Sequence, residues 1–226
     1  MEMRTDTPAA AAALPATLAT WARRGVWLLP VWGVLLTLST LTHQPDYTTD
    51  FPAYADYVTT ATFLASHLVG SIGGAALGAL GAVALGVHLS TSVAARQALW
   101  GMATFVAAQV LLPSVFGVAA FFQPAVARAF QDGERAVAEA INADVYEAPA
   151  VFAMVGVALL LMIAGAIMLG RAAVRAGLGP TWAGVTFAVA VPVFAVGGQI
   201  VSLLHPLAGL AIAASAVALA LAARRG

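Results

Sequence analysis

The chain has 226 residues, of which 62% are hydrophobic and 9% are charged, and its ten arginines balance ten acidic residues. A soluble domain carries about 25% charged residues, so lipid is expected to cover most of this surface. The absence of cysteine excludes disulfide bonds, thiolate metal sites and a cysteine nucleophile. The zero net charge gives no indication of nucleic-acid binding.

The first 20 residues are rich in threonine, alanine and proline. We expect them to form a disordered cytoplasmic tail. The apolar segment after Arg23 and Arg24 has the charge pattern of a signal peptide. No small-x-small cleavage pattern follows it at residues 39–43, so an uncleaved anchor is favoured.

Six segments are apolar enough to be transmembrane helices, since about 20 such residues cross a hydrocarbon core roughly 30 Å thick. Spans five and six are separated only by residues 204–206, where we expect a tight hairpin. A five-span alternative, with the last segment re-entrant, stays open. The sequence therefore predicts an all-α polytopic membrane protein in which residues 21–226 form a bundle of six transmembrane helices. The predicted spans are Val26–Thr42, Thr60–Leu89, Ala98–Phe122, Pro149–Gly170, Thr181–Leu203 and Pro206–Ala223.

The distribution of arginine predicts the orientation. If the N-terminus is cytoplasmic, only Arg128 and Arg135 of the ten arginines fall in outer loops. This is the bias that the positive-inside rule describes. Four tryptophans fall at the cytoplasmic interface, where aromatic belts are found; they are Trp21, Trp27, Trp100 and Trp182. Both the N-terminus and the C-terminus are therefore expected in the cytoplasm.

Two long loops, residues 43–59 and 123–148, are expected on the outer side. The second has apolar residues at roughly helical spacing, from Val126 to Ile141, with an interruption at Gly133. This spacing predicts short amphipathic helices over the outer mouth of the bundle. The inner loops are short, so an exposed function is expected on the outer side.

The second span has a repeat of glycines on one face. At about 100° per residue, these glycines project to the same side as His67. Small residues at this spacing let helix backbones approach closely within a membrane. We expect this face to pack on a neighbouring helix, with His67 inside the bundle because an imidazole facing lipid is costly. The glycines are Gly70, Gly74, Gly78 and Gly81.

Three histidines, His43, His67 and His205, fall in the outer third of the predicted bundle. One interpretation is structural, with His67 hydrogen-bonded to a neighbouring helix. Another is a haem or divalent metal site built from these histidines, since neutral imidazole is a common metal ligand. The polar residues expected near them are Asp46, Ser71, Gln199 and Ser202.

No catalytic motif is present: there is no lysine for a Walker-type GxxxxGK loop and no HExxH. These patterns favour a non-catalytic integral membrane protein, an accessory or binding subunit that contacts a partner protein or lipid through its outer face. A haem- or metal-binding redox protein that uses the outer histidines is one alternative. A small-molecule transporter is another, because Pro113 and Pro192 lie near the middle of predicted spans. Association into a homo-oligomer is also open.

The turn after the fourth span, Arg175-x-Gly177-x-x-Pro180-x-Trp182-x-Gly184, resembles one in uncharacterised bacterial multi-pass proteins that are grouped only as domains of unknown function. The resemblance covers about thirty residues. It implies a location in the bacterial plasma (inner) membrane and no particular activity. Physically, a glycine is expected to end the fourth helix and Pro180 to begin the fifth.

Overall fold

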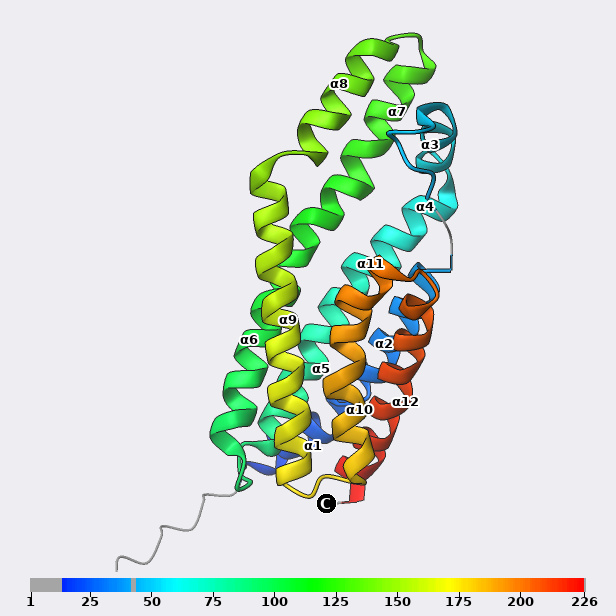
Figure 1. Ribbon diagram of the computed structural model, residues 1–226. Coiled ribbons are helices and arrows are strands. Elements are labelled where there is room, and N and C mark those ends of the chain that lie inside the picture. Colours follow the sequence, from blue (N-terminus) through cyan, green and yellow to red (C-terminus); the bar gives the residue numbers. More distant parts are fainter. Residues whose placement is uncertain (1–13, 42–43, 226) are drawn as a thin grey trace, which may run out of the picture.

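The computed structural model describes residues 14–41 and 44–225, which form helices joined by turns and short connections (Figure 1). Three segments of this described chain, labelled η, are π-helical. In chain order the helices are α1 (Ala16–Gly25), α2 (Leu28–Ser39), α3 (Phe51–Val58), α4 (Ala61–Ala65), η1 (Ser66–Gly73), α5 (Gly74–Leu89), α6 (Ala95–Gly117), η2 (Val118–Phe122), α7 (Gln123–Gln131), α8 (Arg135–Tyr146), α9 (Pro149–Arg175), α10 (Thr181–Pro192), η3 (Val193–Gly197), α11 (Gly198–Ile200) and α12 (Leu204–Arg225).

Four helical stretches of the described residues are long and apolar enough to cross a membrane. The apolar helix Thr181–Gly197 is shorter, and α2 has 12 residues, which is about 18 Å of helix. By length and composition this is an all-helical membrane protein. The four stretches are Ala61–Leu89, Ala95–Gln131, Pro149–Arg175 and Leu204–Arg225.

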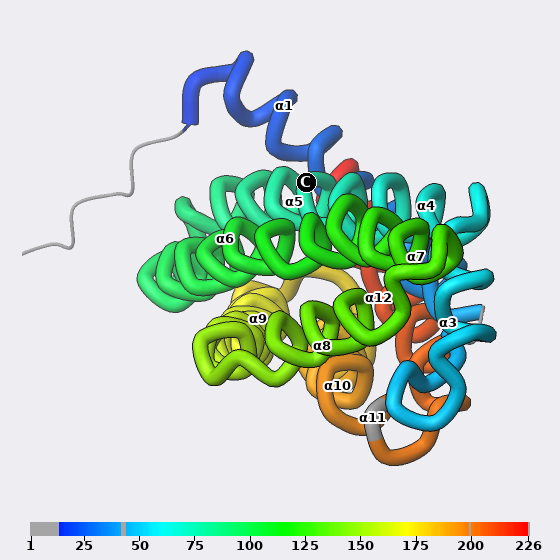
Figure 2. The backbone as a smooth tube through the Cα atoms, turned by 90° about the horizontal axis from the view of Figure 1, so that it is seen from above, coloured from blue at the N-terminus to red at the C-terminus, as the bar shows by residue number. Residues whose placement is uncertain are grey.

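Six helices form a closed ring in chain order: α2 packs on α5, α5 on α6, α6 on α9, α9 on α10, α10 on α12, and α12 returns to α2. Helix α1 lies at the edge of this ring beside α5 (Figure 2). Its first residues belong to the segment expected to be disordered. The helix is stabilised there because Ala22 is fully buried in the contact with the ring. We call the ring the bundle.

The centre of the bundle is filled by three aromatic side chains from three helices. Trp32 of α2, Phe105 of α6 and Phe187 of α10 are all fully buried. The ring centroids of Trp32 and Phe105 are 5.3 Å apart in an edge-on arrangement, and those of Phe105 and Phe187 are 6.4 Å apart. Such edge-on and tilted contacts are favourable for aromatic pairs. They close the middle of the bundle, and we call them the aromatic plug.

The helices of the bundle approach one another at residues with little or no side chain. A Cβ atom added at Gly165 of α9 would lie 2.6 Å from the backbone nitrogen of Phe105 in α6. A Cβ at Gly33 of α2 would lie 2.6 Å from the backbone nitrogen of Ala213 in α12. These distances leave room only for hydrogen, so the backbones are in direct contact.

The glycine face predicted in the second span lies against α2. A Cβ at Gly81 would lie 2.8 Å from the side chain of Leu29, and one at Gly70 would lie 2.8 Å from Cβ of Ser39. There is ordinary van der Waals space only at Gly74, where the nearest atoms are 3.7 Å away. The four glycines that share this contact are Gly70, Gly74, Gly78 and Gly81.

A second hydrophobic core lies at one end of the bundle (Figure 1). Helices α3, α7 and α8 form most of it, with Phe63 added from α4, and we call these three helices the cap. The rings of Phe51 and Phe130 are tilted against each other with centroids 4.8 Å apart, and this contact joins α3 to α7. Helices α7 and α8 form a hairpin within residues 123–148, where the spacing of apolar residues predicts short helices. Gly133 makes the reversal possible because its φ of 106° is in the left-handed region.

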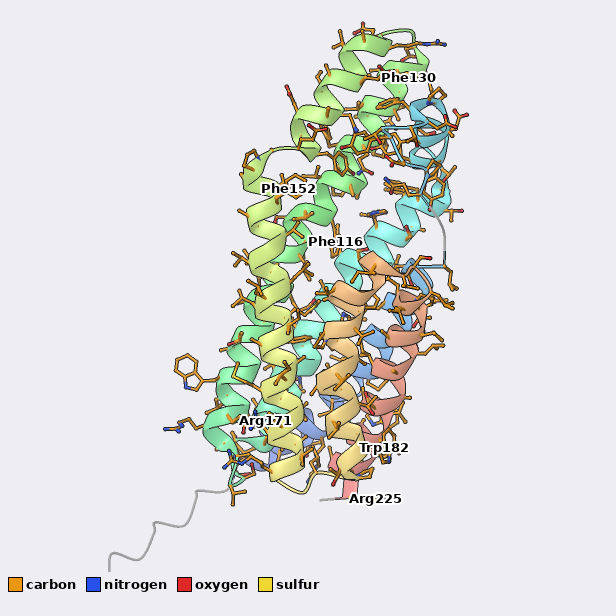
Figure 3. All side chains as sticks on the ribbon, in the orientation of Figure 1. Phe116, Phe130, Phe152, Arg171, Trp182 and Arg225 are labelled. Atoms are coloured by element: carbon orange, nitrogen blue, oxygen red, sulfur yellow. The ribbon has the colours of Figure 1, made fainter. Side chains whose placement is uncertain are left out.

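Charge separates the two ends of the described chain. Every described acidic side chain lies in or next to the cap, between Asp46 and Glu147. At the opposite end of the bundle all the described charged side chains are basic, and we call this the arginine end (Figure 3). Its members are Arg23, Arg24, Arg96, Arg171, Arg175, Arg224 and Arg225.

Candidate functional site

Two prolines disturb the helices at the level between the aromatic plug and the cap. Pro113 lies inside α6 and Pro192 ends α10, and a π-helical segment follows each of them, η2 and η3 respectively. Proline has no N–H, so Pro113 cannot donate to the carbonyl of Gln109 four residues earlier. Single π-helical turns occur frequently at functional sites. The space enclosed by these helices is therefore a candidate site.

They surround a cavity of about 290 Å³, which we call the central cavity. Trp32 of the aromatic plug lines it. Most of its wall is apolar and comes from α2, α6, α9 and η3, including Leu112, Leu159, Met162 and Phe194. Polar side chains are few and uncharged. They are Ser39, Thr40, Ser71, Gln109 and His205.

Gln109 is the most buried of these polar residues, with 3% of its surface exposed. Its Nε2 is enclosed and has no hydrogen-bond partner among the described residues. An amide buried without a partner costs about 1–3 kcal/mol, so such groups in native proteins are normally satisfied by something. The last torsion of glutamine is broad, so the amide of Gln109 can rotate within the cavity wall.

The hydroxyl groups in the wall have already used their hydrogens. Ser39 Oγ donates to the carbonyl oxygen of Leu36 over 2.9 Å, and Thr40 Oγ1 donates to that of Thr37 over 2.9 Å. Such bonds back to the preceding turn are common for serine and threonine within helices. The lone pairs of these hydroxyls remain available, so they can accept a hydrogen bond from a molecule in the cavity.

His205 reaches the central cavity from the first turn of α12. The expected hairpin at residues 204–206 is displaced, because the turn comprises residues 201–203 and α12 already begins at Leu204. Pro206 explains the shift, since proline is well tolerated in the first turn of a helix. The imidazole lies 5.2 Å from the ring of Phe194. It also packs directly on the backbone of Gly198, where an added Cβ would collide with the ring.

A second cavity of about 260 Å³ lies between the bundle and the cap, and we call it the upper cavity. Its lining includes His67, Gln44 and three residues of the cap, which are Gln123, Val145 and Tyr146. Val115 and Phe116 line both cavities, which therefore adjoin at these side chains. Figure 3 labels Phe116 between the cap and the lower part of the bundle.

His67 faces this upper cavity from η1. Its Nδ1 lies 3.0 Å from the carbonyl oxygen of Phe63, and the His67 and Phe63 rings are in tilted contact with centroids 4.2 Å apart. A carbonyl oxygen only accepts, so Nδ1 carries the hydrogen and the lone pair of the neutral ring is on Nε2. The partner is thus a backbone carbonyl of the same helical stretch rather than a neighbouring helix.

The cap contributes two further buried polar groups to the upper cavity. Gln123 is 1% exposed and its Oε1 has no hydrogen-bond partner among the described residues. Burial raises the pKa of Tyr146 to about 12, so its hydroxyl remains neutral and able to donate at physiological pH. The upper cavity, like the central one, is polar in places, and none of the described residues in the two walls is an arginine, aspartate or glutamate.

The residues predicted as a site are therefore divided. His67 and His205 line different cavities, and only Ser71 joins His205. Ser202 and Asp46 are exposed, and the N–H and hydroxyl of Thr48 lower the pKa of Asp46. His43 and the side chain of Gln199 lie outside the described residues. Within the described part of the chain, no three histidine, aspartate or glutamate side chains gather as metal ligands.

The sequence analysis did not include the two buried glutamines, Gln109 and Gln123, among the predicted site residues. The signal was present, because an amide within an apolar helix has to find a partner inside the protein. Ser39, Thr40 and Tyr146 gave no such signal, since small hydroxyls and interfacial tyrosines are ordinary in membrane proteins. No protein-family model, curated protein or solved structure matches this chain, so the geometry of these two cavities is the basis for assigning a function.

Proposed function

We propose that the protein is a non-catalytic membrane protein that binds a small, uncharged and mostly apolar molecule in the central cavity. The observation that carries this proposal is the buried, unpartnered amide of Gln109 in the cavity wall. A ligand that carries a carbonyl or hydroxyl group would satisfy this amide. The sequence left three functions open: a binding or accessory protein, a haem or metal protein, and a transporter. This proposal specifies the first of them by giving the binding protein a class of ligand.

The proposal includes the topology. We propose six spans, one for each helix of the bundle, in the bacterial plasma membrane with the cap outside and both termini in the cytoplasm. The seven described arginines at the end opposite the cap support this orientation. The two short spans, α2 and α10 with η3, lie within the closed ring and pack on neighbouring helices.

The chemistry of the wall defines the class of ligand. Ligand pockets for small molecules are mostly apolar, with a few polar groups that fix the orientation, and measure about 300–1,000 Å³. The central cavity is at the lower end of that range at about 290 Å³. It has no charged side chain, which favours a neutral ligand. The amide of Gln109 and the hydroxyls of Ser39 and Thr40 together fit a ligand that has both an acceptor and a donor.

The route to the cavity supports a function on the cap side. The aromatic plug fills the bundle below the central cavity, and the upper cavity adjoins it above. A ligand would therefore enter between cap and bundle. In this arrangement the cap is also the part that a partner protein would contact, which retains the expected role of an accessory subunit.

Transport is the second candidate function. The observation that favours it is the π-helical segments η1 and η3 beside the central cavity and η2 beside the upper one. Transporters often place discontinuous helices around a substrate site near the middle of the membrane. The described residues provide no comparable support for a haem or metal site, because the two described outer histidines line separate cavities.

The test is to identify what the purified protein carries. We would extract the detergent-purified wild type with organic solvent and compare the extract, by mass spectrometry, with those of Ser71→Phe and Gln109→Leu. Ser71→Phe fills the cavity and Gln109→Leu removes the amide. The matched control is Leu160→Phe, because Leu160 is 69% exposed on the outside of α9.

A neutral molecule in wild type and Leu160→Phe, absent from Ser71→Phe and reduced in Gln109→Leu, is the expected result. Extracts that do not differ among the four proteins would contradict the proposal. A metal or haem in stoichiometric amount would replace it with the redox alternative. Uptake of the identified molecule into vesicles containing the protein would favour the transporter.

A further inference from the structure

A groove between α9 and α10 lies away from both cavities, toward the arginine end. Its volume is about 570 Å³. Most of its apolar wall comes from Ile167 and Val174 of α9, Val185 and Val189 of α10, and Val193 at the start of η3. Val185 and Val189 are about half exposed, so the groove is open to the surroundings of the bundle.

The groove owes its shape to a contact between two glycines. A Cβ at Gly170 of α9 would collide with the backbone carbonyl of Gly184 in α10. The two backbones therefore touch at this point, and the larger side chains beyond it cannot fill the surface between the helices. From Gly184 to Val193 the apolar wall continues for about 14 Å of helix.

Two arginines lie at one end of this apolar wall. Arg171 and Arg175 are one turn apart on α9, both exposed and both in the groove lining. Arg175 Nη1 donates to Oε1 of Gln97 over 3.1 Å, which holds its guanidinium in place. Every described carboxylate is at the cap end, so none of them can neutralise these charges.

We propose that this groove binds an anionic phospholipid, with its phosphate on Arg171 and Arg175 and an acyl chain along the valines of α10. Guanidinium groups match phosphate geometrically and pair with it by charge-assisted hydrogen bonds. Basic pockets between transmembrane helices are known sites for anionic lipid head groups. The apolar wall of the groove begins at Arg171 and Arg175. This arrangement fits an amphipathic molecule, in which a charged head group is attached to an apolar chain. A free phosphate would leave that wall uncovered.

The site is distinct from the central cavity, so its test does not depend on the proposed function. We would measure lipid retention by native mass spectrometry after adding dioleoylphosphatidylglycerol or dioleoylphosphatidylcholine to the detergent-solubilised full chain. The variants are Arg171→Gln, the double variant Arg171→Gln/Arg175→Gln, and Val189→Trp, which narrows the groove. Arg224→Gln/Arg225→Gln is the matched control because it removes the same charge from α12 at the same end, away from the groove lining.

The expected result is that wild type and the α12 control retain the phosphatidylglycerol about tenfold better than the phosphatidylcholine, as two charge-assisted pairs imply. The Arg171→Gln/Arg175→Gln variant should lose this preference, and Arg171→Gln should lose part of it. Val189→Trp should reduce retention of both lipids. Equal retention of the two lipids by wild type would overturn the proposal.

Two further outcomes would also overturn it. An equal loss in the α12 control would mean that any basic surface suffices. Competition by millimolar inorganic phosphate, with full retention in Val189→Trp, would mean that the arginines bind the anion without the chain. Because all four arginines are exposed, elution as a single symmetric gel-filtration peak is expected of each variant before the lipid measurement.

Discussion

The bundle and the cap are held together in different ways. In the bundle, helices meet at glycine and alanine, as at Gly165 against the backbone of Phe105. In the cap, large aromatic side chains fill the space between helices, as at Phe51, Tyr54 and Phe130. The larger core cluster contains many alanines, whereas the smaller one is built largely from rings.

The difference follows from the solvent that each region is proposed to face. Within a membrane, lipid tails are as apolar as leucine, so close packing of backbones rather than hydrophobic burial drives helix association. In water, removing a large aromatic surface from solvent is the main favourable contribution. The two regions should therefore respond in opposite ways to the loss and to the gain of side-chain volume.

Loss of volume should have its largest effect in the cap. Phe130→Ala should destabilise the cap by about 3–5 kcal/mol, the usual cost of truncating a buried phenylalanine. Its ring is buried against Phe51, and Arg135 lies over it at 5.4 Å. Hydrogen exchange followed by mass spectrometry should show faster exchange in α3, α7 and α8.

Exchange in α9 and α12 should remain unchanged, because the cap has its own core. Phe121→Ala is the control, since Phe121 is 64% exposed on the helix that leads into the cap. It should alter neither region. If Phe130→Ala accelerated exchange throughout the bundle, the two cores would be one cooperative unit and the comparison would fail.

Gain of volume should act on the bundle. Gly165→Ala places a methyl group against the backbone of α6 and should destabilise the protein by about 1–3 kcal/mol through overpacking. Gly156→Ala makes the same change in the same helix, where no atom lies within 4 Å of the new Cβ. It should stabilise by up to about 1 kcal/mol, because alanine favours helix over glycine. Thermal unfolding in detergent should show shifts of opposite sign, and equal shifts would contradict the backbone contact.

These two regions also differ in how far the sequence predicts them. Glycines such as Gly70 and Gly81 recur at helical spacing within one span, so their shared face can be recognised locally. The contact between Phe51 and Phe130 joins distant segments, and no local pattern indicates it. The third predicted span ends at Phe122, but the helix continues through Pro124 to Gln131; the sequence does not reveal this because proline usually marks a break. The π-helical turn of η2 precedes Pro124 and widens the helix there, so the proline is accommodated.

The candidate site is likewise predictable from local sequence but not in its contacts between distant segments. That His67 and His205 belong near one end of the bundle follows from counting residues along their helices. Their separation into two cavities depends on the side chains of Val115 and Phe116, which come from another helix. Sequence periodicity gives the depth of a residue along its helix, but not the side chains that stand between it and a residue of another helix.

Alkaline pH should loosen the cap while the bundle persists. The hydroxyl of Tyr54 is buried and donates to Oδ1 of Asn142 over 3.0 Å, and burial raises the pKa of Tyr54 above its usual value near 10. The unfolded cap therefore loses this proton at lower pH than the folded cap. Stability is fully present below pH 10 and falls as the pH rises beyond it. Phenolate absorbance against pH should show late ionisation steps.

Tyr54→Phe separates the two contributions of this hydroxyl. At neutral pH it should cost about 1 kcal/mol, the net value of a hydrogen bond. Above pH 10 it should weaken the dependence of cap stability on pH and remove one late ionisation step. If all the phenols of the folded wild type ionised together near pH 10, Tyr54 would not be enclosed in the cap.

The smallest effect on stability is expected from a substitution between the bundle and the cap, Ser71→Cys. Ser71→Cys changes one atom in the wall of the central cavity. The chain has no other cysteine, so a thiol reagent that cannot cross membranes will report this position alone. We expect labelling of membrane vesicles from the cap side only, because the aromatic plug closes the other side. Ser215→Cys is the control: Ser215 is fully buried in α12 and bonded to the carbonyl of Ile212, so it should react only after denaturation.

Each other outcome of this labelling has a definite meaning. Labelling of Ser71→Cys from the arginine side would show a passage around Trp32, Phe105 and Phe187, as a transporter requires. No labelling from either side would show that cap and bundle seal the cavity, so that a ligand exchanges only when they separate. In that case Phe130→Ala, which loosens the cap without touching the cavity, should restore the reaction. The aromatic core of the cap would then control access to a cavity that the close-packed bundle holds open.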